Sequence, residues 1–282
     1  MKSCATRTTR LLHGSPALAL AMLVCATPAL AQNVSLGTAA NFGVLAGSAV
    51  TNTGPTVVTG NVGVSPGTSI TGFPPGSVAP GSGFLHSADS VALQAQSDLT
   101  TAYNDAATRV CGTPIAGGVL GGLVLTPGVY CMGAGDLTGT LTLNGAGVYI
   151  FQMASSLTTA SASSVVLQNG ATACGVWWQV TSSATLGTAS AMAGNILALT
   201  SITLNTSATL SGRTLARNGA VTLDSNTVTA CSGGPVPAVP PPVPVPVIAG
   251  AAPIPTLSEW AMILLAGLMV IAAYGAMRRR KA

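Results

Sequence analysis

The chain has 282 residues, of which 48% are hydrophobic, 6% charged and 4% aromatic. Its formal net charge of +4 comes from the two ends, because residues 32–231 carry three basic side chains against five aspartates, a net charge of −2. That balance removes the electrostatic basis of nucleic-acid binding. The five aspartates are scattered and His86 is the only histidine of this region, so we expect no enzyme, no metal centre and no cofactor.

The first 31 residues have the features of a secretory signal peptide. A basic start (Lys2 to Arg10) precedes an apolar run over residues 18–24, and a small-x-small sequence at residues 29–31 provides a cleavage site before Gln32. We therefore expect export through the inner membrane and a mature domain over residues 32–231.

The mature domain opens with short Val/Thr/Gly stretches and a Pro/Gly loop, followed by one helix over about residues 86–109. Residues 36–72 are expected to form strands separated by turns, and residues 73–85 form the loop. Ser87 is the expected N-cap of the helix. The apolar stripe at helical spacing consists of Val91, Ala95, Leu99, Ala102, Tyr103 and Ala106.

Three similar stretches follow at intervals of 19 and 18 residues, beginning at Gly175, Gly194 and Gly212. This is about the length of one coil of a β-solenoid, in which coils stack roughly 4.8 Å apart and matched residues form columns. Each coil has one threonine between two apolar residues, namely Thr185, Thr203 and Thr222. Because strand side chains alternate between faces, these threonines should point toward solvent.

A second column follows at a corner of each coil. Turn-forming residues precede Thr188, Thr206 and Ser225. A further coil begins at residue 147, where matching Gln152 to Gln179 and Leu157 to Leu186 extends the threonine columns to Ser156 and Thr159.

Three strands are apolar at both alternating positions, over residues 148–151, 176–178 and 196–199. Strands of this kind are covered on both faces. The predicted helix is the expected cover, with one ring of Trp177 and Trp178 in the solenoid core and the other beneath the helix. The third coil, with Arg213, breaks the apolar pattern, so we expect the helix to end before it.

Four cysteines remain after signal removal: Cys111, Cys131, Cys174 and Cys231. Disulfides are expected in the oxidising compartment outside the inner membrane, and the sequence permits three pairings. Cys174 and Cys231 would lie three coils apart if stacking is sequential, roughly 14 Å, which is beyond disulfide reach. The sequence therefore favours Cys111 with Cys131.

The C-terminal region has the layout of a tail for attachment or release. Residues 232–253 form a Pro-rich linker, and residues 254–282 resemble the IPTL-type sorting signal of Gram-negative bacteria, with an apolar stretch at 261–277 before a basic tail. The resemblance implies transient insertion in the inner membrane and processing by an exosortase- or archaeosortase-like enzyme. We expect a protein that is secreted or held at the cell surface.

Residues 36–67, the helix with its Ala-Gln-Ala-Gln sequence, and the strands at 125–130, 176–180 and 194–206 closely resemble the microbial ice-binding (antifreeze) protein family. This resemblance implies a mainly β fold: a discontinuous right-handed β-solenoid of triangular cross-section, with one long α-helix packed along one face. It also implies that one flat, Thr-rich face binds ice. The candidate ice-binding residues are Thr59, Asn61, Ser156, Thr159, Ser161, Thr185, Thr188, Ser190, Thr203, Thr206 and Thr222.

The function expected from these features is non-catalytic adsorption to the surface of an ice crystal. A cell-surface adhesin or a structural protein of the biofilm matrix would share the signal peptide, linker, tail and Thr/Ser-rich solenoid, so it remains the alternative. Ice affinity separates the two.

Overall fold

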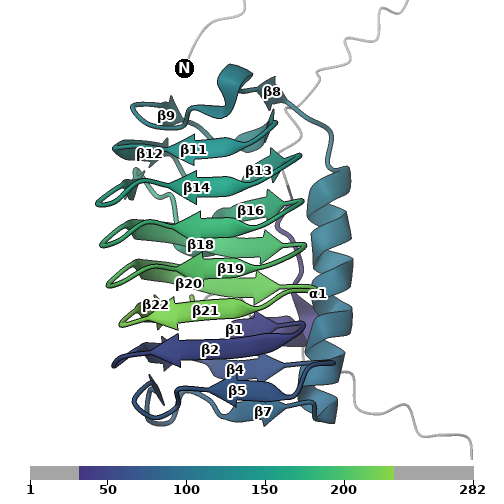
Figure 1. The fold of residues 1–282 in the computed structure, drawn as a ribbon. Helices are drawn as coiled ribbons and strands as arrows, with labels where there is room; N and C mark the ends of the chain where they lie inside the picture. The colour runs from purple at the N-terminus through teal and green to yellow at the C-terminus, as the bar shows by residue number, and fades with distance from the viewer. Residues whose placement is uncertain (1–31, 232–282) are drawn as a thin grey trace, which may run out of the picture. The chain divides into compact units, whose positions relative to one another are not determined.

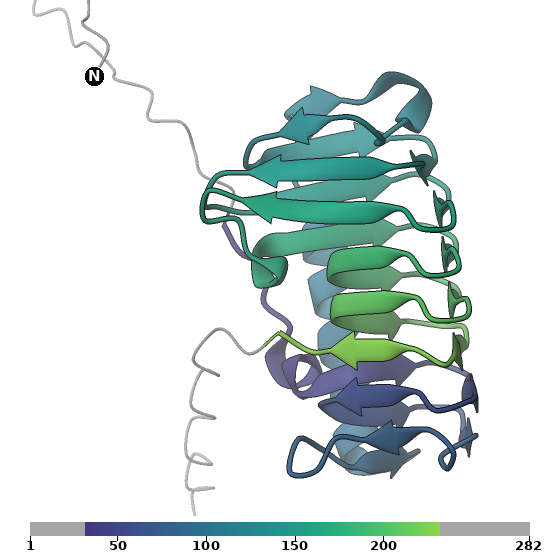
Figure 2. The same ribbon diagram turned by 90° about the vertical axis from the view of Figure 1, so that its left-hand side faces the viewer.

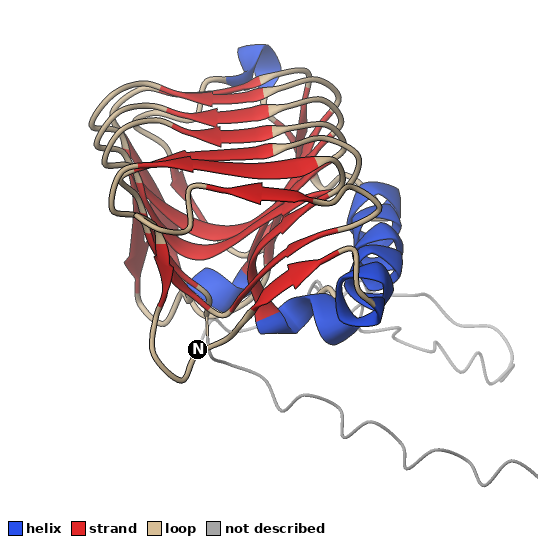
Figure 3. Ribbon diagram, turned by 60° about the horizontal axis from the view of Figure 1, so that its bottom comes forward, coloured by secondary structure: helices blue, strands red, loops and turns tan. Residues whose placement is uncertain are grey.

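The structure is a computed structural model that describes residues 32–231, and this region is a stack of parallel β-coils with three sides (Figure 1). Figure 3 views the stack obliquely and shows the sheets that form its sides, with the helix outside one corner. All the strand pairs are parallel. The expected fold, a mainly β solenoid with one long helix alongside, is confirmed.

The strands group into three faces. The helix face consists of β8 (Thr113–Pro114), β10 (Gly128–Met132), β13 (Tyr149–Met153), β16 (Val176–Val180), residues 194–198 of β18 (Ala191–Ala198), residues 212–216 of β20 (Thr209–Ala216), β1 (Phe42–Ala46), β4 (Asn61–Val64) and β7 (Leu85–Ser87). The threonine face is the seven-stranded sheet of β11 (Gly135–Leu137), β14 (Leu157–Thr159), β17 (Ala184–Leu186), β19 (Ile202–Leu204), β21 (Val221–Asp224), β2 (Ala49–Thr53) and β5 (Ser69–Thr71).

The third face completes each coil. It consists of β9 (Val124–Leu125), β12 (Thr140–Asn144), β15 (Ser164–Gln168), the first halves of β18 and β20, β22 (Thr227–Thr229), β3 (Val57–Thr59) and β6 (Ser77–Val78). The helical segments are η1 (Gly37–Asn41), α1 (Ser90–Thr108), η2 (Ala116–Gly118) and η3 (Ala173–Gly175).

The solenoid is discontinuous, because its N-terminal coils stack on its C-terminal coil. Strand β1 pairs with β20 on one side and with β4 on the other. In the same way β2 pairs with β21, and β3 with β22. The chain then returns along the stack as α1 before it forms the coils at the other end (Figure 1).

The core is made of columns of like residues. Ala184, Ile202 and Val221 are in register on the threonine face and are buried. Deeper in the stack Trp178 lies over Phe151, with ring centroids 4.2 Å apart. The Trp178 indole N–H donates to the carbonyl of Ala193 at 2.9 Å, so this ring is structural.

The other tryptophan lies beneath the helix, as the sequence predicts. Trp177 packs with Ala102, Tyr103 and other buried residues of α1, and its indole N–H donates to Asn33 Oδ1 at 2.9 Å. The strands under α1 are buried at nearly every position. A small-residue stripe on the helix lets it lie close to this apolar face.

The start of the helix differs from the prediction. Leu85–Ser87 is strand β7, which pairs with β4, and the N-cap is Asp89, whose Oδ1 accepts a hydrogen bond from the backbone N–H of Ala92 at 2.8 Å. Val91 is 44% exposed and Ala92 takes its expected place on the buried stripe. Successive side chains differ by about 100° around a helix axis, so a shift of one residue turns Val91 away from the strands beneath α1.

The helix also extends over the Arg213 coil, contrary to the prediction. Leu215 is fully buried in the same cluster as Ala95 and Leu99 of α1, and Gln96 Nε2 donates to the carbonyl of Ala216 at 3.1 Å. Arg213 of β20 turns toward the corner, so the polar part of the strand lies away from the helix. Leu215 of the same strand contacts α1.

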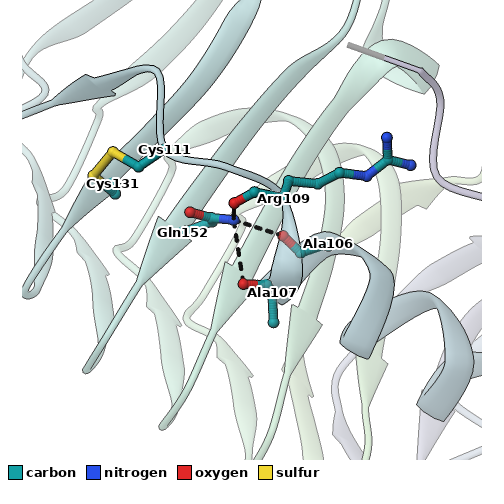
Figure 4. The surroundings of a disulfide bond; sticks show 6 residues. All are labelled: Ala106, Ala107, Arg109, Cys111, Cys131 and Gln152. Atoms are coloured by element: carbon teal, nitrogen blue, oxygen red, sulfur yellow. Dashed lines mark hydrogen bonds between the residues drawn. A yellow bond between two sulfur atoms is a disulfide. The ribbon is translucent and has the colours of Figure 1, made fainter.

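Cys111 and Cys131 form a disulfide just after the helix, as the sequence favours, with Cα atoms 5.8 Å apart. Figure 4 shows Gln152 beside it, whose Nε2 donates to the carbonyls of Ala106 at 2.9 Å and Arg109 at 2.7 Å. These carbonyls are left without intrahelical partners at the helix C-terminus, so Gln152 fixes where α1 ends.

The predicted signal peptide, linker and sorting tail lie outside the described residues. Among residues 32–231, no helix has the length and apolar character needed to cross a membrane.

Candidate functional site

The dominant surface feature of the described region is one column of threonines on the threonine face. Thr185 is in register with Thr203, and Thr203 with Thr222. Each of the three lies between two buried apolar residues and points outward, as the alternation in sequence predicts. The backbone pairing fixes these side chains one coil apart, roughly 4.8 Å.

The column continues in both directions beyond the three threonines found from the repeat. Thr158 of β14 is in register with Thr185. At the other end Thr51 of β2 pairs with Thr222, and Thr71 of β5 pairs with Thr51. Six consecutive coils therefore present a threonine at the same place, and we call these residues the threonine column.

Small residues border the threonine column on one side. The preceding outward positions are Ser156, Ser183, Ser201, Ala220, Ala49 and Ser69. Ser183 Oγ lies 3.0 Å from the hydroxyl of Thr200, which precedes the border residue Ser201. Small side chains beside the threonines keep the face flat.

The corner column lies on the other side and differs by one residue from the prediction. The corner positions are Ser161, Thr188, Thr206, Asp224 and Thr53, as the backbone hydrogen bonds that link successive corners show. Asp224, not Ser225, stands next to Thr206 and accepts a hydrogen bond from its hydroxyl. The β21 coil is one residue shorter at this corner, which shifts Ser225 to the left-handed position held by Ser207 in the neighbouring coil.

Two assignments from the coil at residue 147 are corrected by the register. Gln152 pairs with Gln179 as expected, but Leu157 pairs with Ala184 and not with Leu186. Ser156 therefore belongs to the serine border. Thr159 points inward, is 3% exposed, and accepts a hydrogen bond from the backbone N–H of Gly187 at 2.9 Å.

Ser190 is also excluded from the surface, because it is fully buried at the inner side of the corner. Its Oγ has no hydrogen-bond partner. The equivalent position in the next coil is Ala208, which makes the same backbone turn. The Ser190 side chain is therefore part of the core.

Thr59 and Asn61 lie elsewhere on the molecule. Thr59 belongs to β3 of the third face and Asn61 to β4 of the helix face. Both line a groove of about 450 Å³ that also includes Phe84 and Cys231. Asn61 Oδ1 accepts a hydrogen bond from the backbone N–H of Phe84 at 2.9 Å, which gives it a structural role.

Charged side chains meet the threonine face only at its margins within the described region. Asp136 continues the threonine column at the β11 end, where its Oδ1 accepts a hydrogen bond from Thr138 Oγ1 at 2.9 Å. Asp224 stands at the corner. Between these two, the outward residues of β14, β17 and β19 are uncharged.

Comparisons with known proteins place the chain in a family. A family model described as ice-binding-like matches residues 44–229. The chain belongs to this ice-binding-like family. An ice-binding protein of Nostoc sp. (strain HG1) is 54% identical over 213 residues, which cover 73% of this chain and 78% of the relative. An ice-binding protein of a Colwellia species is 39% identical over 213 residues, covering 70% of this chain and 83% of the relative.

Solved structures of ice-binding proteins have the same fold as this member of the family. One from an Antarctic biological consortium is 47% identical with a TM-score of 0.69, covering 72% of this chain and 94% of that chain. Another, from the Antarctic ascomycete Antarctomyces psychrotrophicus, is 44% identical with a TM-score of 0.69, covering 72% of this chain and all of that chain. A second family model, the IPTL-CTERM motif, matches residues 252–281.

Proposed function

We propose that this protein binds ice through the threonine face. The observation that carries the proposal is the threonine column: six adjacent coils hold a hydroxyl and a methyl group at the same outward position. The names of its relatives, which are ice-binding proteins, support the same function. The third face supports it less, because its outward column is less uniform. That column consists of Thr140, Ser164, Ala191, Thr209, Thr227, Val57 and Ser77.

The proposed mechanism depends on rigidity. Each threonine contributes one weak contact, so the face gains affinity only if its side chains lose little entropy when they meet the crystal. Backbone hydrogen bonds between coils hold the threonine column in place, and β-branched side chains are restricted at χ1. The hydroxyls and methyls then order surface water in a repeating pattern that merges with the ice lattice.

The titratable groups support a non-catalytic role. His86 Nδ1 lies 2.7 Å from Asp89 Oδ2, and Asp105 forms an ion pair with Arg109 at 2.8 Å. Asp98 is bound by Thr38. These side chains hold the ends and middle of the helix, and none of them faces the threonine column.

The C-terminal motif supports export and surface display. The IPTL-CTERM match covers residues 252–281, which is consistent with processing by an exosortase- or archaeosortase-like enzyme after transient insertion of residues 261–277 in the inner membrane. Release of the processed domain and its attachment at the cell surface are both compatible with this tail.

The proposal is tested by measuring thermal hysteresis and partition of the protein into a slowly growing ice hemisphere. We expect the unmodified protein to be taken up into ice and Thr203→Tyr to lose most of both activities, because the new ring interrupts the threonine column. The matched control is Thr227→Tyr, which places the same ring on an outward position of the third face.

Both variants should keep their unfolding midpoints, because the substituted side chains are at the surface. Equal losses of thermal hysteresis and ice uptake in the two variants would show that ice binding is not specific to the threonine face. An unmodified protein that stays out of the ice but binds cells or polysaccharide would replace the proposal with the adhesin alternative.

A further inference from the structure

Cys174 and Cys231 lie much closer together than stacking of regular coils allows. The estimate of three coils assumes that every corner has the same length, but the corner before β16 is longer. Residues 169–175 form a loop that ends in η3, whereas β18 and β20 continue through the same corner without a break. The loop packs against both β18 and β20, so it extends along the solenoid axis.

The end of the described chain reaches the same place from the opposite direction. Cys231 follows β22, and its Sγ accepts a hydrogen bond from Arg213 Nη1 at 3.0 Å and lies 3.7 Å from Asn195 Oδ1. Asn195 Nδ2 in turn donates to the carbonyl of Val176, two residues after Cys174, at 3.3 Å. Figure 2 shows the corner loop and the C-terminal exit on the same edge of the solenoid.

Both cysteines lie at this edge, Cys231 beside Asn195 Oδ1 and Cys174 two residues before the carbonyl that Asn195 Nδ2 binds. Burial, together with a hydrogen bond to the Cys231 thiol, raises the pKa of Cys174 to about 12, so this thiol is protonated at neutral pH. Cys231 accepts a hydrogen bond from the Arg213 guanidinium and lines the groove of about 450 Å³, which gives an oxidant access to its sulfur.

We propose that Cys174 and Cys231 form a second disulfide in the exported protein, which ties the C-terminal end of the domain to the coil of β16. Both thiols are half-buried, and neither forms a disulfide in this structure. The proposal rests on the export proposed above, because a compartment with an oxidant is required.

The oxidant is a thiol–disulfide oxidoreductase with a reactive disulfide. The Cys231 thiolate attacks one sulfur of that disulfide, the bond between the oxidant's two sulfurs breaks, and the other sulfur leaves as a thiolate. Cys174 then loses its proton and attacks the Cys231 sulfur of the mixed disulfide, which releases the oxidant as a dithiol. Two electrons and two protons pass from the two cysteines to the oxidant.

The bond would secure the point at which the linker and sorting tail begin. A load applied to the tail reaches the domain at Cys231, which is held by Arg213 through its Sγ and its carbonyl oxygen. A disulfide to Cys174 would pass that load to the coil of β16 and prevent β22 from separating first.

Tryptic mapping of the exported full-length chain, alkylated without reduction, tests the pairing. Trypsin leaves Cys111, Cys131 and Cys174 in the peptide of residues 110–213 and Cys231 in the peptide that begins at residue 218. We expect these two peptides to be linked, and the link to persist in Cys111→Ser/Cys131→Ser, where Cys174 is its only partner in the first peptide. Alkylated Cys174 and Cys231 in the exported chain would overturn the proposal.

A second arm separates a failure of geometry from a failure of export. The Cys111→Ser/Cys131→Ser chain, purified reduced and folded, is treated with oxidised glutathione and mapped in the same way. A disulfide between Cys174 and Cys231 after this treatment supports the proposed proximity of the two thiols, and two free thiols would overturn it. A link here together with free thiols in the exported chain would overturn the proposal for the cell and assign the failure to export.

Thermal unfolding provides a third measurement on the oxidised protein. We expect Cys174→Ser, Cys231→Ser and the double variant to lower the midpoint equally, by about 5–15 °C, because each removes the same cross-link. Additive losses that persist after reduction would show two independently packed thiols and would overturn the proposal.

Discussion

At the scale of single residues, the direction of a side chain decides whether a hydroxyl belongs to the surface or to the core. Thr158 and Thr159 are neighbours in sequence, yet the first lies on the threonine column and the second is buried and bound to Gly187. Ser190 is buried as well, without a partner. The type of residue alone does not separate these roles.

Ser190→Ala is expected to leave the free energy of unfolding unchanged or to raise it by about 1 kcal/mol, because it removes a buried hydroxyl without a hydrogen bond. Ala208 already occupies the equivalent position in the next coil. The matched control is Ser163→Ala. Ser163 is equally buried, but its Oγ donates to the carbonyl of Leu137 at 2.8 Å.

The control should lower the free energy of unfolding by about 1 kcal/mol. Chemical denaturation of the two variants and the unmodified protein measures both effects. A loss at Ser190 as large as that at Ser163 would show that the Ser190 hydroxyl has a partner in solution.

At the scale of the elements, the helix and the strands beneath it form one packed unit with two anchors. Small residues of α1 allow close contact with the helix face, and Asp98 binds the segment η1. Asp98 Oδ2 accepts from Thr38 Oγ1 at 2.6 Å and from the Thr38 backbone N–H at 2.7 Å. The helix is therefore secured both by apolar contact and by a charged hydrogen bond.

Acid is expected to weaken the Asp98 anchor. Burial disfavours the charged carboxylate, but the two hydrogen bonds from Thr38 outweigh this effect and hold the pKa of Asp98 below its ordinary value. The stabilisation is thus complete above the pKa of the unfolded chain and is lost as the pH falls through the lower pKa of the folded protein.

Asp98→Asn keeps an acceptor at this position without the charge, and should cost about 1 kcal/mol at pH 7. Denaturation between pH 7 and pH 3 should show a smaller loss of stability for the variant than for the unmodified protein. If the free energy of unfolding fell by the same amount in both proteins, the Asp98 carboxylate would not contribute to the loss of stability in acid.

Enlarging a small residue on the buried side of α1 should disturb the apolar contact between α1 and the helix face. Ala95 is fully buried against Leu99, Leu197 and Leu215, so Ala95→Leu should lower the free energy of unfolding by about 1–3 kcal/mol through overpacking. Leu93 is 61% exposed on the same helix, and Leu93→Ala should change stability by less than about 0.5 kcal/mol. Urea titrations compare the two, and a tolerated Ala95→Leu would indicate a looser contact.

At the scale of the whole molecule, the discontinuous order of the coils makes the threonine column long. The column would end at Thr222 if coils stacked in chain order. Insertion of β2 beside β21, and of β5 beside β2, adds Thr51 and Thr71. One column of threonines thus includes segments that are more than 150 residues apart in sequence.

A charge placed in the middle of the threonine column should damage ice binding more than the same charge at its end. Thr203 has threonines on both sides in the column, whereas Thr71 has a neighbour only in Thr51. Thermal hysteresis of Thr203→Asp should therefore fall further than that of Thr71→Asp. Similar losses would mean that ice contacts the whole column with equal weight, and a larger loss at Thr71 would shift the contact toward the β5 end.

The sequence by itself determined the features that repeat locally. Alternation around Thr185, Thr203 and Thr222 predicted their outward direction, and the apolar strands predicted a covered face with Trp177 and Trp178 on its two sides. The pairing of Gln152 with Gln179 was also readable from sequence, and the same spacing of 27 residues leads from Thr158 to Thr185. Applied throughout that coil, it would have located Thr158.

Only the tertiary structure decided what brings distant segments together. The joining of β2 to β21 follows from closing a stack whose N-terminal coils would otherwise leave unpaired backbone edges, and no sequence interval encodes it. The proximity of Cys174 and Cys231 depends on a corner loop that extends along the axis, which equal coil spacing does not describe. Periodic side-chain patterns report the local backbone, whereas contacts between coils depend on how corners of unequal length are accommodated.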